Sequence, residues 1–310
     1  RDIGVTGVQT CALPIFLPFL VLGACLSGCQ PDDIRFDDNP VPHYEGVPTV
    51  VVNAYLTRAY IDLIGREPLP GEMEQDRAAL RAGDLDLAAR LALVDRLMGG
   101  DETHLEAHDQ KVFDDLSGRF LDGTSQQTLI NEMEFQRFLA QQDSVNGGNA
   151  YPFFNLLADR LERTIVSVDE FRLGTIGWRE VNRRFCDNVI YDEINMNSFN
   201  FVNATFDDLF GRYPTEAEFE QAFSAVETGS PAVLFGEVIQ DKQSYLQVLV
   251  DDTEFEEGAV RWWAEKLLVR PITGAEMVAW REVAGPDVDV RELQRLLISS
   301  DEYEIGRAHV

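Results

Sequence analysis

The stretch FDDLFGRYPTEAEF, Phe206 to Phe219, describes the end of one helix and the start of the next. Gly211 suits the left-handed backbone at which helices commonly end, and Pro214 prevents the first helix from continuing. Thr215 and Glu218 have the spacing of a capping box, in which two side chains satisfy free backbone groups at a helix start. The stretch therefore predicts a helix–turn–helix unit.

The same pattern occurs twice more, in YIDLIGREPLPGEM (Tyr60 to Met73) and AEKLLVRPITGAEM (Ala264 to Met277), and the three units align without gaps. Each unit has an arginine, a glutamate six residues after it, and a second glutamate farther on. Repetition on this scale indicates stacked helical units. The arginines are Arg66, Arg212 and Arg270, the first glutamates are Glu72, Glu218 and Glu276, and the second glutamates are Glu102, Glu254 and Glu302.

Two interpretations are open for the polar residues of these units. The shared arginine could bind an anion, but pairing with the glutamates of its own unit is the simpler expectation. Acidic stretches precede a third helix at 83–87 and 286–290, where an aspartate could cap the helix or bind calcium. We expect capping, because a calcium loop of the EF-hand type needs further oxygen ligands and a terminal glutamate that are not in place.

The rest of the chain also has helical periodicity, and no alternating run long enough for a convincing strand is found. The sequence therefore predicts an all-α fold of tandem helical repeats, three related units, with a helical middle region. A break at SVNGGNAYP gives the best internal boundary. We expect an N-terminal helical domain at 51–145, a helical middle region at 146–198 and a C-terminal helical domain at 199–303.

Before these helices lies FLPFLVLGACLSGC, an apolar run of the kind found in secretory signals and too short to span a bilayer. Its end, Leu26 to Cys29, resembles the bacterial lipobox. The resemblance implies a signal peptide at 16–28, lipid attachment at Cys29 with several acyl chains such as palmitate, and an acidic, flexible tether at 29–50. The alternative is a buried apolar helix with an incidental cysteine.

The residues after Cys29 bear on location. Gln30 is not the aspartate that holds many lipoproteins in the inner membrane, so the resemblance implies a lipid anchor in the outer membrane of a Gram-negative bacterium. Asp32 and Asp33 also resemble the acidic export signal of surface-exposed lipoproteins, which leaves surface exposure open. Multiple acyl chains would make the anchoring stable.

The two ends of the chain resemble translations of the same short DNA sequence. VTGVQTCALPI at 5–15 and EIGRAHV at 304–310 resemble translations of the two strands of a common sequencing adapter. We therefore expect 1–15 and 304–310 to be adapter-derived artefacts that take no part in packing. We also expect the chain to be a fragment whose natural ends are missing.

The composition excludes some partners. With 54 acidic and 26 basic residues the chain has a net charge of −28, which disfavours nucleic acid because phosphate binding needs clustered basic side chains. Cys186 is expected to be a buried small hydrophobe. Adjacent acids such as Asp114–Asp115 and Asp207–Asp208 are expected to lie on solvated faces.

Only one pair of residues suggests catalysis. His104 and His108 lie four residues apart, which is ligand-like spacing for zinc, but the HExxH order and a third ligand are missing. Motifs for covalent haem, nucleophilic serine, nucleoside triphosphates and dinucleotides are also missing. We therefore expect no enzyme, no cofactor and no metal site. The alternative is a metal-dependent envelope enzyme that uses His104 and His108.

The motif LIGREP, at 63–68, resembles a helical repeat similar to phycobilisome linkers, which is found in bacterial extracellular proteins. The stretch at 59–73 also resembles a domain of unknown function that accompanies cytochromes in planctomycetes. Both resemblances imply assembly or adhesion. The sequence therefore favours a membrane-anchored structural or protein-interaction module with a protein partner. An accessory subunit of an envelope redox or polymer-handling complex is a further alternative.

Overall fold

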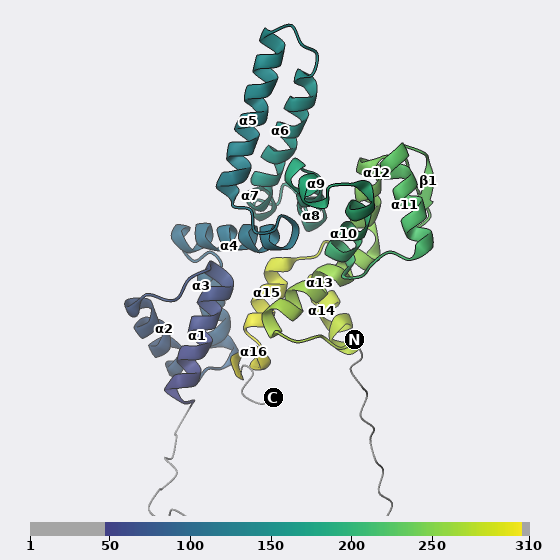
Figure 1. Cartoon of the computed structure of the whole chain (residues 1–310). Coiled ribbons are helices and arrows are strands. Elements are labelled where there is room, and N and C mark those ends of the chain that lie inside the picture. The colour runs from purple at the N-terminus through teal and green to yellow at the C-terminus, as the bar shows by residue number, and fades with distance from the viewer. Residues whose placement is uncertain (1–46, 306–310) are drawn as a thin grey trace, which may run out of the picture. The chain divides into compact units, whose positions relative to one another are not determined.

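The computed structural model describes residues 47–305 and confirms the predicted all-α fold (Figure 1). Cys29, where we expect lipid attachment, and the expected signal peptide at 16–28 lie outside the described residues. The helices are α1 (Thr49–Ile64), α2 (Pro70–Ala82), α3 (Leu87–Leu97), α4 (Glu102–Phe120), α5 (Gln126–Val145), α6 (Tyr151–Ile165), α7 (Ser167–Arg172), α8 (Trp178–Cys186), α9 (Val189–Asn195), α10 (Ser198–Phe210), α11 (Glu216–Thr228), α12 (Lys242–Asp251), α13 (Thr253–Leu268), α14 (Gly274–Ala284), α15 (Val290–Ile298) and α16 (Asp301–Ile305).

One small hairpin was not predicted. Strands β1 (Ala232–Leu234) and β2 (Glu237–Ile239) pair in antiparallel fashion. Phe235 and Gly236 form the turn between them, both with positive φ, which is the backbone that tight hairpin turns require. Strands of three residues are too short for a recognisable alternation of polar and apolar positions.

The turn of each unit forms as the sequence predicts. Helices α1 and α10 end at Gly65 and Gly211, whose φ values of 72° and 71° are left-handed. Helix α13 ends in the same conformation at Val269, with φ 57°, although a β-branched residue is strained there. The next helices, α11 and α14, each begin with a complete capping box.

The remaining helix starts are also explained by local chemistry. Helix α2 begins with Pro70 and lacks a side-chain cap, but Glu72 Oε2 accepts a hydrogen bond from the Leu69 amide at 2.7 Å. Asp86 caps α3 and Asp289 caps α15, each by accepting a hydrogen bond from a backbone amide. The expectation that aspartates at these two places cap helices is therefore confirmed.

Helices α5 and α6 form a long antiparallel hairpin (Figure 1). Residues 146–150, where we expected a domain boundary, are its turn. Asp143 Oδ2 holds this turn by accepting hydrogen bonds from the amides of Ala150 and Tyr151 at 2.7 and 2.8 Å. An ion pair of 2.7 Å between Arg137 and Glu162 joins the two helices. The boundary expected at residue 145 therefore falls inside one supersecondary element.

The first and third units pack against each other, since α1 contacts α16 and α3 contacts α15. Tyr303 of α16 is buried against Tyr55 of α1, and its hydroxyl donates to Asp62 at 2.7 Å. Arg90 of α3 is buried and pairs with Asp301 and Glu304 of α16. Glu304 therefore takes part in packing, contrary to our expectation that 304–310 would not. Residues 306–310 lie outside the described residues.

The described residues share a hydrophobic core, to which all three units contribute. A region with its own core is expected to fold by itself. Residues 47–305 belong to one compact body. Within 47–305, no helix combines the length and the hydropathy needed to cross a membrane.

Candidate functional site

The arginine of the second unit, Arg212, lies between two carboxylates. It donates through Nη1 and Nη2 to Glu218, both at 2.9 Å, and through Nε and Nη2 to Glu254, the latter at 2.6 Å. Its remaining N–H donates to the Tyr213 carbonyl at 3.1 Å. All five guanidinium donors are therefore occupied, and none is directed at a free anion site.

The third unit repeats this geometry. Arg270 donates to Glu276 and to Glu302, with the Nη2–Oε2 bond to Glu302 at 2.6 Å, and to the Pro271 carbonyl at 2.9 Å. Hydrogen bonds from the arginines lower the pKa of Glu218 and of Glu276 to about 2. The expected pairing of each arginine with the glutamates of its own unit is confirmed here.

The first unit departs from the pattern. Arg66 donates to Glu72 at 2.7 and 2.8 Å, which lowers the pKa of Glu72 to about 2. No ion pair joins Arg66 to Glu102 within the part of the chain that the structure describes. His104 lies beside Glu72 instead, with its Nε2 3.6 Å from Oε1, and Glu102 lines a cleft. The first unit therefore leaves a carboxylate free of the arginine.

The two histidines of the metal hypothesis do not share a site. His104 Nδ1 lies 2.6 Å from Asp101 Oδ2, so this imidazole belongs to the polar contacts at the start of α4. His108 is buried and neither ring nitrogen forms a hydrogen bond, the Asp109 carboxylate being 3.9 Å from Nδ1. Within residues 47–305, no group of three or more histidine, cysteine or acidic side chains is arranged to hold a metal ion.

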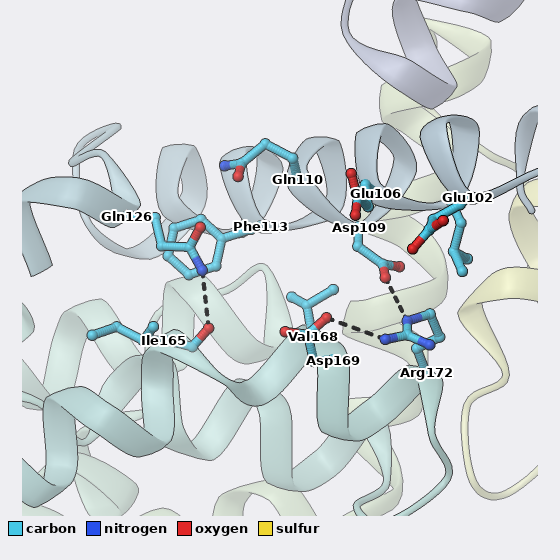
Figure 2. Close-up of a pocket in the computed structure, with 11 residues that line it drawn as sticks. Glu102, Glu106, Asp109, Gln110, Phe113, Gln126, Ile165, Val168, Asp169 and Arg172 are labelled. Atoms are coloured by element: carbon cyan, nitrogen blue, oxygen red, sulfur yellow. Dashed lines mark hydrogen bonds and ion pairs between the residues drawn. The ribbon is translucent and has the colours of Figure 1, made fainter. Parts of the chain in front are cut away.

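A cleft of about 430 Å³ lies between α4 and α7, with Gln126 of α5 and Ile165 of α6 at one end (Figure 2). Arg172 crosses it, with its Nε 2.6 Å from Asp109 Oδ2 and its Nη2 3.4 Å from Asp169 Oδ1. Glu102 and Glu106 extend from α4 and form no ion pair with any described residue. The arginine neutralises part of the acidic lining, and the exposed glutamates are solvated.

Two acids that we expected on solvated faces are in fact turned toward the interior, Asp115 being buried and Asp208 half-buried. The side chain of Asp115 is buried and pairs with Lys111 and with Lys266, the latter at 2.7 Å. Asp208 accepts a hydrogen bond from the Tyr191 hydroxyl at 2.7 Å, and burial raises the pKa of Asp208 to about 6. Neighbouring residues on a helix point in different directions, so one acid of each pair faces inward.

Cys186 lies in the interior, within reach of the charge on Asp208. It is a free, fully buried thiol, as the sequence predicts, and burial raises its pKa well above the usual range. A thiol of this kind is a poor nucleophile because the thiolate is the reactive form. Comparisons of the chain with protein families, with curated proteins and with solved structures found no match.

Proposed function

We propose that the chain is an outer-membrane lipoprotein, anchored through Cys29, whose helical body acts as a structural or protein-interaction module. One observation carries the second part of the proposal. The hairpin of α5 and α6 exposes large apolar side chains, among them Phe135 and Phe138, each more than half accessible to solvent. Clustered apolar side chains on a surface mark sites of interaction.

The ion pairs of the three units support the same proposal. Each shared arginine is bound to carboxylates of its own unit, so these residues stabilise turns rather than bind a ligand. We interpret the three units as related helical repeats that form a stable body, whereas the hairpin itself packs on α7, α8 and α9. Stacked helical units commonly present an extended surface to a partner.

Mass spectrometry of the mature chain tests whether Cys29 carries the proposed lipid anchor. After expression in a Gram-negative host and isolation of membranes, we expect Cys29 to be N-terminal and acylated. Cys29→Ala should abolish the modification, whereas Cys186→Ala, which removes the buried thiol, should leave it intact. A soluble, unmodified product that retains residues 16–28 would contradict the anchor.

A further inference from the structure

Helix α5 carries a stripe of uncharged side chains on one face. Its members are three or four residues apart, which is the spacing of the two seam positions in a coiled coil. All of them are exposed. The stripe consists of Thr128, Asn131, Phe135, Phe138, Gln142 and Val145.

The stripe lies on the side of α5 that faces away from α6. The residues of α5 that are buried are Leu129, Gln136 and Ala140. At about 100° per residue, these three lie roughly opposite the stripe. Helix α5 thus has two uncharged faces, one covered by α6 and one that no described element covers.

We infer that the stripe pairs with the same stripe of a second chain, in antiparallel orientation, so that two hairpins meet through their α5 helices. Charge favours a second chain as the occupant. Two molecules with a net charge of −28 repel each other over most of their surfaces. The stripe carries no charge, so two chains can meet there without opposing carboxylates.

The order of residues in the stripe is self-complementary about its centre. A two-fold axis between Phe135 and Phe138 places Phe135 of one chain against Phe138 of the other. The next layer then pairs the amides of Asn131 and Gln142, and the outermost layer pairs Thr128 with Val145. Aromatic side chains meet aromatic ones, and amides meet amides.

The charged residues beside the stripe select the antiparallel orientation. Glu132 and Glu134 flank its N-terminal half, whereas the corresponding flanks of its C-terminal half are Leu139 and Gln141. In an antiparallel pair the glutamates of one chain face the uncharged half of the other. In a parallel pair the glutamate-bearing halves of the two helices would lie side by side, which brings like charges closer together and is less favourable.

The inference rests on the proposed function, because membrane anchoring is what would make the pairing of two chains strong enough to persist. Helix α5 has 20 residues and is about 30 Å long, so the contact is small compared with the ~800 Å² per partner of a standard interface. We therefore expect weak pairing in solution. Two chains anchored in one membrane have a higher effective concentration, which favours pairing.

The mass in solution tests the inference. For residues 44–310, which include the core that the structure describes, sedimentation equilibrium up to about 100 µM should show a monomer that converts to twice its mass. Phe135→Glu with Phe138→Glu should remain monomeric, with an unchanged far-ultraviolet circular dichroism spectrum. The matched control, Val238→Glu with Val278→Glu, adds the same charge at exposed sites elsewhere and should associate like the wild type.

A wild-type monomer throughout this range, or association that the phenylalanine variant retains, overturns the inference. Neither result affects acylation of Cys29, so failure of the pairing is distinguishable from failure of the anchor. The orientation has its own test. Asn131→Arg with Gln142→Glu places opposite charges together in an antiparallel pair and should associate at least as tightly as the wild type.

In the same test, Asn131→Arg with Gln142→Arg should associate at least about tenfold more weakly, because like charges then face each other. A parallel pair would be weakened by both double variants, since identical residues meet in each layer. Equal weakening of the two variants would therefore overturn the antiparallel arrangement.

Discussion

Replacing Gly258 by alanine is expected to destabilise the protein by about 3 kcal/mol or more, although alanine ordinarily stabilises a helix interior. Gly258 lies in α13, where this helix crosses α10. A Cβ atom at this position would lie 2.0 Å from the carbonyl oxygen of Leu209 and 2.9 Å from the Cα of Phe210. These are backbone atoms that no rotamer change can move, so the two helices would have to separate.

A matched control is available in α4. A Cβ atom added at Gly118 would meet nothing within 4 Å, so Gly118→Ala should stabilise the protein by about 0.5–1 kcal/mol. Urea unfolding followed by circular dichroism measures both changes. Similar free energies of unfolding for the two variants would show that α10 and α13 do not cross as closely as the structure describes.

Removing the arginine of the second unit should have the next largest effect. Arg212→Ala leaves Glu218 and Glu254 facing each other without a cation, and we expect a loss of about 2 kcal/mol at neutral pH. Arg212→Lys should recover only part of it, because an ammonium group cannot donate two parallel hydrogen bonds to each carboxylate. The control is Arg163→Ala, which removes an exposed arginine whose side chain bonds only within its own helix.

The effect should depend on pH in a defined direction. Hydrogen bonds from Arg212 lower the pKa of Glu218 from 4.5 to about 2 in the folded protein. The stabilisation is therefore fully present above pH 4.5 and is lost as the pH falls toward 2. Discounted for partial exposure, it amounts to about 1–2 kcal/mol.

Acid titration of the free energy of unfolding measures this contribution. The wild type should lose stability more steeply than Arg212→Ala between pH 4.5 and 2, so the two proteins converge at low pH. Parallel curves through this range would contradict the ion-pair geometry. Arg163→Ala should follow the wild-type curve.

Local chemistry made much of the fold predictable. The turn at Gly211, the capping box of Thr215 and Glu218, and the pairing of Arg212 with Glu218 join residues that are close in sequence. Such contacts depend on backbone geometry that the residue types dictate. The same reasoning explains why the aspartate caps were predicted correctly.

Contacts between distant segments were not predictable in this way. The sequence does not show that His104 lies beside Glu72, and this contact distinguishes the first unit from the other two. Nor does adjacency to Asp207 show that Asp208 is bonded to Tyr191 of another helix. The stripe on α5 is visible in the sequence as a regular series of uncharged positions that includes Phe135 and Phe138. That these side chains are exposed to solvent could be learned only from the structure.

Photo-cross-linking in the envelope tests the central claim most directly. A photoreactive amino acid would replace Phe138 in the full chain, expressed in a Gram-negative host, and membranes would be isolated after irradiation. The account predicts a covalent product of two chains in the membrane fraction, and none when the photoreactive residue replaces Val278. Full-length chains recovered only as monomers, or only in the soluble fraction, would contradict an anchored protein that pairs through α5.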